Sequence, residues 1–185
     1  MISLSIYASI AILILMKIFI YDACSLIYLA KINVREKLVH LGSVNVSSIV
    51  KSELISEKEK YSDARVLQEN LDKKIIEEMK LKRGKSIFSK NVGKGEDESI
   101  QLCLQIDATL VTDDHHAVSI ALNAGLIPKT SEIILIDLLK EEIINYEDFK
   151  NYFRELAQIK VLKPEIVLFF TNKAMEIVKN NSKGG

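Results

Sequence analysis

Residues 17–25 read KIFIYDACS, and they contain the clearest indication of the fold in this sequence. Its first part, Lys17–Tyr21, is a short apolar run after one lysine, which is typical of a buried strand in a parallel sheet. Asp22 follows directly, at the point where the strand should end. Since open α/β sheets place their ligands outside the carboxyl ends of their strands, we expect Asp22 to lie at a ligand-binding edge.

Acidic residues recur at comparable points farther along the chain. Glu53 lies in VSSIVKSEL, Glu96 lies in GKGEDESI, and Asp113 and Asp114 follow the apolar run ATLVT. Carboxylates that converge from separate segments repel one another, and divalent cations usually relieve that repulsion. Mg²⁺ and Mn²⁺ prefer oxygen ligands. The pattern therefore predicts a metal-dependent site that cleaves phosphodiesters.

Each of these acids also fits a simpler role when it is taken alone. Asp22 would serve as a turn or cap residue, and Asp113 with Asp114 would form a capping pair. Glu53 would lie on a solvated helix face, and Glu96 would favour the positive end of a helix dipole. The metal-site hypothesis therefore depends on the joint pattern.

Composition limits the class of protein. The chain has 185 residues, 48% of them hydrophobic, which suits one domain with a substantial core. Its 25 basic residues balance 25 acidic ones, which argues against a protein that binds nucleic acid by bulk charge, although a local basic patch is compatible. Cys24 and Cys103 lack the spacing of metal ligands, so we expect small core residues in a reducing, cytoplasmic compartment.

The amino terminus is apolar and uncharged from Met1 to Met16. Without the strand at Lys17–Tyr21, about 15 residues remain, or roughly 23 Å of helix against roughly 30 Å of hydrocarbon. We expect residues 1–15 to be a dispensable extension or a packed apolar helix. A membrane anchor and a cleaved signal stay open as alternatives, although no basic residue precedes the apolar run.

Strand and helix patterns alternate along the chain and predict an α/β fold, with a central parallel sheet flanked by helices and a helical C-terminal tail. We expect the main domain at 16–140 and the tail at 141–185. Strands are predicted at 17–21, 43–46, 86–89, 108–112 and 126–128. Helices are predicted from Ser25, from Ser47–Ser48, and at 63–80, 98–106, 117–124, 131–144, 146–158 and 163–180.

Four motifs, in this order and spacing, resemble those of the PIN domain family. They are the strand that ends at Asp22 with SLIYLAK after it, V-S-x-x-V-x-x-E at Val46–Glu53, GxGExE at Gly93–Glu98, and LVTDD at Leu110–Asp114. The chain looks most like the short prokaryotic and archaeal toxin-type nucleases of this family. The resemblance covers about Met16 to Leu139, and the tail sequence KPEIVLFFTNKAMEIV also looks like the ending of that type.

The resemblance implies a carboxylate cluster that holds Mg²⁺ or Mn²⁺ and cuts RNA. By position, the catalytic residues are Asp22, Glu53, Glu96 and Asp114. The metal ligands are Asp22, Glu96 and Asp114, with Glu53, Glu98 and Asp113 supporting. Cys24 departs from the family, which often has Ser or Thr there, and a thiol is a poor ligand for a hard cation.

The resemblance also implies partners. We expect an RNA substrate and the role of toxin in a type II toxin–antitoxin pair, and an antitoxin protein and a second copy of the chain stay open as partners. A basic stretch, Lys82, Arg83, Lys85 and Lys94, leads toward Glu96 and is either a solvated loop or a binding site for RNA phosphates. His115 and His116 are expected at the surface. The alternative function is a catalytically silent module that binds RNA or a partner.

Overall fold

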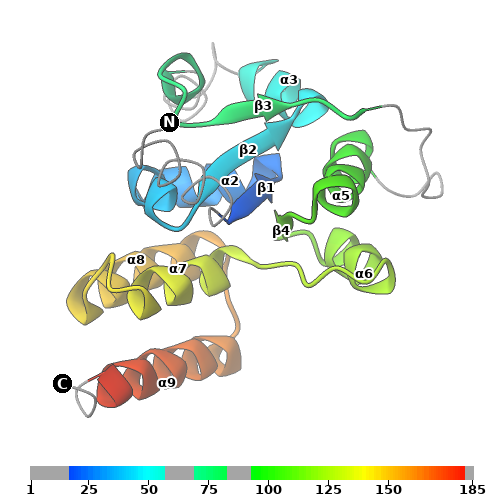
Figure 1. Ribbon diagram of the computed structural model, residues 1–185. Helices are drawn as coiled ribbons and strands as arrows, with labels where there is room; N and C mark the ends of the chain where they lie inside the picture. The colour runs from blue at the N-terminus through cyan, green and yellow to red at the C-terminus, as the bar shows by residue number, and fades with distance from the viewer. Residues whose placement is uncertain (1–16, 57–68, 83–92, 182–185) are drawn as a thin grey trace, which may run out of the picture.

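The computed structural model describes residues 17–56, 69–82 and 93–181 (Figure 1). In these ranges the strands form one four-stranded sheet in the order β3-β2-β1-β4. The strands are β1 Ile18–Tyr21, β2 Ser43–Ser47, β3 Glu77–Met79 and β4 Thr109–Val111. All three pairings are parallel, with Phe19 of β1 in register with Val44 of β2 and Thr109 of β4. The predicted strands at 17–21, 43–46 and 108–112 are confirmed.

The central strand β1 is apolar because both faces of the sheet are covered. Phe19 and Tyr21 point into one hydrophobic cluster, with residues of α2 (Ala23–Lys31), α7 (Ser131–Lys140) and α8 (Tyr146–Ile159). Ile20 points the opposite way, into a second cluster with residues of α5 (Lys94–Ile106). Alternate strand residues face opposite sides of a sheet. The run KIFIY therefore encodes a strand between two helical layers.

The remaining helices complete the two layers and the tail. They are η1 Arg35–His40, a 3₁₀ helix, with α3 Ser48–Ser56, α6 His115–Asn123 and α9 Pro164–Asn181. In Figure 1, α5 and α6 lie on one side of the sheet, α7 and α8 lie on the other, and α9 packs outside against α7 and α8. The predicted parallel sheet with flanking helices and a helical C-terminal end is confirmed.

The prediction of one helix over 63–80 is wrong at its C-terminal end. Residues 69–72 are helical, but Lys74 has a φ of 55°, and the chain then enters strand β3. The amides of Ile75 and Ile76 donate to the carbonyl of Asn70 at 2.9 and 3.2 Å, which closes the helix end. Ile76 fits a helical apolar spacing, yet it is buried in the core beside the sheet. Pairing of Asn45–Ser47 with Glu77–Met79 overrides the local pattern.

Two other expectations change in detail. Asp22, rather than Ser25, is the N-cap of α2. Residues 126–128 form no strand, and the residue after them, Lys129, forms an isolated parallel bridge with Val111. Pro128 has no amide hydrogen, so this segment has one donor fewer for a strand ladder. The predicted strand at 86–89 and the apolar residues 1–15 lie outside the described residues.

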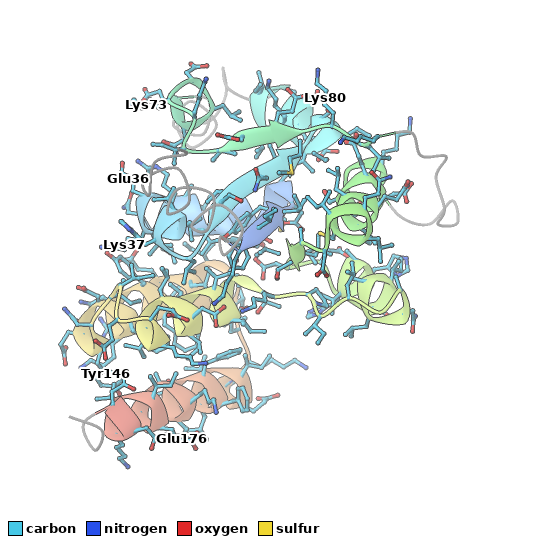
Figure 2. All side chains as sticks on the ribbon, in the orientation of Figure 1. Glu36, Lys37, Lys73, Lys80, Tyr146 and Glu176 are labelled. Atoms are coloured by element: carbon cyan, nitrogen blue, oxygen red, sulfur yellow. The ribbon has the colours of Figure 1, made fainter. Side chains whose placement is uncertain are left out.

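Charged side chains of both signs are spread over the outside of the molecule (Figure 2). Glu36 and Lys37 lie side by side on η1, and Lys73, Lys80 and Glu176 lie at other edges. This distribution agrees with the balanced composition of the chain. Within the described ranges, no helix is both long enough and apolar enough to cross a bilayer.

Candidate functional site

Two neighbouring strands bring Asp22 and Asp114 to the same edge of the sheet. Strands β1 and β4 are parallel neighbours, and the Asp22 amide donates to the carbonyl of Val111 at 3.0 Å. The Asp22 side chain is the N-cap of α2: its Oδ1 accepts from the Ser25 amide at 2.7 Å and from the Ser25 hydroxyl at 2.5 Å. Its Oδ2 accepts from the Thr112 hydroxyl. Asp22 is therefore held at both oxygens by groups from two segments.

Burial makes the charge of Asp22 costly. The residue is 4% exposed, and this desolvation raises the pKa of Asp22 to about 6, with a smaller contribution from the negative charge of Asp113. Hydrogen bonds from Ser25 and Thr112 act in the opposite direction without cancelling the burial. A buried carboxylate in this condition is stabilised by a nearby cation.

Thr112 connects the two strand ends. Its hydroxyl donates to Asp22 and accepts from the Asp114 amide at 3.2 Å. Asp114 is exposed and is the N-cap of α6, where its Oδ1 accepts from the Ala117 amide at 2.7 Å. Its second oxygen receives no hydrogen bond from any described residue. The simpler cap role thus holds for both acids, and it places both carboxylates at the same edge.

Glu53 and Glu96 lie at the neighbouring part of the edge, on α3 and α5. The two carboxylate oxygens of Glu53 lie 3.0 and 3.1 Å from the point that a Cβ on Gly95 would occupy. A side chain at position 95 would therefore displace Glu53. Partial burial raises the pKa of Glu53, and the charges of Glu96 and Asp22 raise it further. Three predicted acids therefore act on one another electrostatically.

Glu98 and Asp113 make contacts of another kind. Glu98 Oε2 accepts from the Ile49 amide at 2.8 Å, so Glu98 ties α5 to the first turn of α3. Asp113 accepts from the Ser131 amide at 2.9 Å, from the Ser131 hydroxyl, and from Lys160 at 2.7 Å. Both carboxylates are occupied by protein groups, whereas Glu53 and Glu96 have no hydrogen-bond donor among the described residues.

Cys24 is exposed on the first turn of α2, two residues after Asp22, so the expectation of a core residue is wrong for Cys24, whereas Cys103 is buried as expected. Partial desolvation of the sulfur raises the pKa of Cys24 to about 11, and the charges of Asp22 and Asp113 contribute in the same direction. The side chain therefore remains a neutral thiol at neutral pH. It is the thiolate that binds metals, so Cys24 is unsuited as a ligand.

The remaining predicted residues lie at the surface or outside the described part of the chain. Lys82 and Lys94 are exposed, and Lys94 lies in the first turn of α5, two residues before Glu96. His115 and His116 are exposed in the first turn of α6. Arg83 and Lys85 fall outside the described residues. Lys94 is thus near Glu96 in sequence, but residues two apart on a helix do not face the same way.

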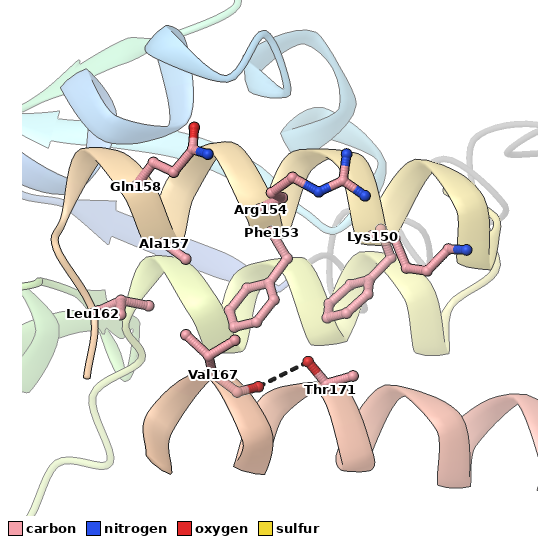
Figure 3. A pocket seen from close by; sticks show the side chains of 9 residues that line it. Lys150, Phe153, Arg154, Ala157, Gln158, Leu162, Val167 and Thr171 are labelled. Carbon is pink, nitrogen blue, oxygen red and sulfur yellow. Dashed lines mark hydrogen bonds between the residues drawn. The ribbon is translucent and has the colours of Figure 1, made fainter. Parts of the chain in front are cut away.

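A pocket of about 430 Å³ lies elsewhere, between α8 and α9 (Figure 3). Phe153 and Val167 face each other across it, and none of the predicted site residues lines it. The candidate functional site is therefore the carboxylate edge, which we define as the edge of the sheet with Asp22, Glu53, Glu96 and Asp114, and not this pocket.

The donor set fits a hard divalent cation by type, because all the candidate ligands are carboxylate oxygens. The negative charge of the group fits as well, since the charges of Glu96 and Asp22 add to burial in raising the pKa of Glu53. No three Asp, Glu, His or Cys side chains in the described ranges lie close enough together to hold a metal ion as they stand. Binding would therefore require Asp114 and Glu96, which are accessible to solvent, to turn toward Asp22.

Two groups that hold Asp22 were not among the predicted site residues. Ser25 and Thr112 both donate to its carboxylate. A signal for each was present: a hydroxyl three residues into a helix that starts after Asp22, and a hydroxyl residue ahead of the Asp113–Asp114 pair. No local signal marks Lys160, which is 47 residues from Asp113.

Comparison with known proteins agrees with this geometry. A family model described as a PIN domain matches residues 18–169, which is well over half of the chain. No curated protein and no solved structure matches. The matched region contains the whole sheet, the four acids and most of the C-terminal helices. With a nuclease-type fold and this extent of match, the chain belongs to the PIN domain family.

Proposed function

We propose that the protein is an endoribonuclease that depends on Mg²⁺ or Mn²⁺. One observation carries the proposal: the Glu53 carboxylate of α3 lies against Gly95 of α5, the residue before Glu96. The pKa of Glu53 is raised first by burial and then by the charges of Glu96 and Asp22. Asp114 is joined to the same edge through Thr112. Mutual repulsion of this kind is what a bound cation would relieve. Membership of a nuclease-type family supports the same reaction class.

Asp22, Glu96 and Asp114 would hold the cation, with Glu53 supporting. When bound, the metal lowers the pKa of a water molecule and stabilises negative charge on the leaving oxygen. Ser25 and Thr112 orient Asp22 through hydrogen bonds to both of its oxygens. Gly95 leaves the space in which the Glu53 carboxylate lies. No side-chain nucleophile is needed in this scheme.

We further propose RNA as substrate and a toxin role in the cytoplasm, with an antitoxin as protein partner and a homodimer as assembly. Support comes from the resemblance to toxin-type PIN nucleases. Lys94, which is exposed in the first turn of α5, would contact a phosphate of the bound RNA. Phosphate contacts position a nucleic acid without reading its sequence.

The direct test is cleavage of a single-stranded RNA by the purified protein. Cleavage is expected with Mn²⁺ or Mg²⁺ and should stop on addition of EDTA. Asp114→Asn, which keeps the shape of the cap residue, should reduce cleavage by orders of magnitude while the protein stays folded. Cleavage that survives chelation would rule out the metal mechanism.

A catalytically silent binding module is the second candidate. Cys24, at a position where the family often has Ser or Thr, favours it, as does the absence of a closed metal cluster among the described residues. Calorimetric titration with Mn²⁺ separates the two candidates. RNA binding without Mn²⁺ binding at millimolar metal would support the silent module.

A further inference from the structure

Lys160 lies at the C-terminal end of α8 and contacts the turn that carries Asp114. Its ammonium group lies 2.7 Å from Asp113 Oδ1 and 2.5 Å from Glu132 Oε1. The Lys160 side chain is 12% exposed, and those of Asp113 and Glu132 are 1% and 5% exposed. Burial alone would lower the pKa of Lys160, but the two carboxylates raise it above its usual value, so the ammonium stays charged.

Asp113 stands between Thr112 and Asp114, and the contacts of all three residues fix the turn. Thr112 donates to Asp22, and Asp114 caps α6. Asp113 faces the other way, toward Lys160 and the hydroxyl and amide of Ser131 at the start of α7. The turn is therefore held on one side by the candidate metal site and on the other by the C-terminal helices.

We propose that Lys160 is a positioning residue for the metal-binding carboxylates, acting through Asp113 to set the turn that presents Asp114 beside Asp22. The inference rests on the proposed function. The helical tail then has a direct role at the site, because the Lys160 ammonium at the end of α8 binds Asp113. Asp113 is therefore occupied by contacts within the protein and is not available to a metal. Asp114 is then the member of the pair that is left to face a metal.

The charge of Lys160 and its proposed positioning role predict opposite changes in metal affinity when Lys160 is replaced. An ammonium group near an acidic site repels a divalent cation, so by charge alone its loss should strengthen metal binding. If Lys160 positions the turn, its loss should weaken metal binding, because Asp114 no longer meets Asp22 in a fixed arrangement. Groups that orient metal ligands typically contribute about tenfold to 100-fold in affinity.

The test measures the Mn²⁺ dissociation constant of the full chain by calorimetry, without RNA. The main variant is Glu132→Gln with Lys160→Met, which removes one positive and one negative charge and leaves Asp113 in place. Its Mn²⁺ affinity should fall about tenfold or more. The matched control is Asp137→Asn with Lys129→Met, which removes a second ion pair between a lysine and α7. The control should bind Mn²⁺ as the unchanged protein does.

Lys160→Arg keeps a cation within reach of both acids and should restore most of the affinity. Circular dichroism reports folding of each variant. If the double variant does not fold, Lys160→Gln replaces it, and weaker Mn²⁺ binding is again expected. Unchanged or tighter binding in the folded Lys160 variants would overturn the positioning role while leaving the nuclease proposal intact. An unchanged protein that binds no Mn²⁺ would overturn both.

Discussion

At the scale of single residues, the site combines a buried acid with partly exposed ones. Asp22 is held by Ser25 and Thr112, so its position is defined before any cation binds. Glu53 and Glu96 have carboxylates without donors among the described residues. In the proposed metal site, the buried acid would therefore be a ligand in a fixed position, and the partly exposed acids would be ligands that can adjust. Burial of the charged Asp22 carboxylate lowers the free energy of unfolding of the metal-free protein.

Replacing Asp22 by Asn should stabilise the metal-free protein at neutral pH. The pKa of Asp22 is about 6 when folded against a usual value of 3.8, so the folded state binds the proton more tightly than the unfolded state. Stability should therefore fall as pH rises from about 4 to 6 and stay reduced above that range, by about 3 kcal/mol. Asp22→Asn should flatten this dependence. Thermal unfolding with EDTA at pH 4 to 8 measures it, and a lower melting temperature at pH 7 would contradict the assignment of burial as the main cause.

Gly95→Ala should reduce metal-dependent cleavage without weakening helix α5. The new Cβ would lie within 3.1 Å of both Glu53 oxygens, so the carboxylate must move and metal-dependent cleavage should fall. Alanine inside α5 is otherwise favourable to the helix by roughly 0.5–1 kcal/mol. Gly125→Ala is the control with the opposite pattern: its φ of 86° makes alanine strained, with a cost of roughly 1–2 kcal/mol, while cleavage should persist. Equal activity of Gly95→Ala and the unchanged protein would show that Glu53 is dispensable.

At the scale of elements, α5 contacts α3 through two acids of its first turns, Glu96 and Glu98. Glu98 accepts from the Ile49 amide at the start of α3, whereas Glu96 acts on Glu53 at the carboxylate edge. The same helical turn therefore stabilises α3 and supplies a candidate metal ligand. Since Glu53 lies on α3, the contact made by Glu98 also helps to fix Glu53.

Glu96→Gln should consequently affect mainly RNA cleavage, whereas Glu98→Gln should affect mainly the free energy of unfolding. Glu98→Gln weakens the charged acceptor for the Ile49 amide and should lower the free energy of unfolding by about 1 kcal/mol, as loss of a helix cap does. Glu96→Gln should leave stability nearly unchanged and strongly reduce cleavage. Chemical denaturation and RNA cleavage are measured on both variants. The reverse pattern would assign the metal-ligand role to Glu98.

At the scale of the whole molecule, the proposed binding of RNA by a neutral chain would depend on local charge. The 25 basic and 25 acidic residues cancel, so no long-range field holds a polyanion. Lys82 and Lys94 of the basic stretch are exposed, and Lys94 is the first residue of α5, two positions before Glu96. Binding should therefore depend on a small number of phosphate contacts.

Replacing Lys82 and Lys94 by Gln should weaken RNA binding and reduce its salt dependence. Each lost phosphate contact should lower the slope of log affinity against log salt by about 0.7 for a single strand. Mn²⁺ affinity should not change. Fluorescence anisotropy with labelled RNA from about 50 to about 300 mM salt measures the slope. Lys150→Gln with Lys173→Gln, on α8 and α9, is the matched control, and an equal slope for both double variants would show that the basic stretch is only solvated.

Sequence patterns were sufficient to predict those strands and helices that depend on the pattern of neighbouring residues. The run KIFIY predicts β1 because a strand covered on both faces must be apolar throughout, and the residue after it is then at the edge of the sheet. The same reasoning placed Asp114 after β4. Helix α5 was predicted too, although it begins at Lys94 rather than Glu98. Gly125 ended a helix as expected, with a positive φ.

Other features were decided by contacts between distant segments. The spacing of Ile75, Ile76 and Met79 suits a helix, yet pairing with β2 makes the last part of this segment a strand, because sheet hydrogen bonds form between residues about 30 positions apart. Which acid of α5 faces the other carboxylates depends on how α5 packs beside α3. That acids follow β1 and β4 could be read from the order of residues alone. The hydrogen bond from Thr112 to Asp22 and the contact of Lys160 with Asp113 could not, because such contacts depend on where the packed helices and strands place their side chains and not on spacing along the chain.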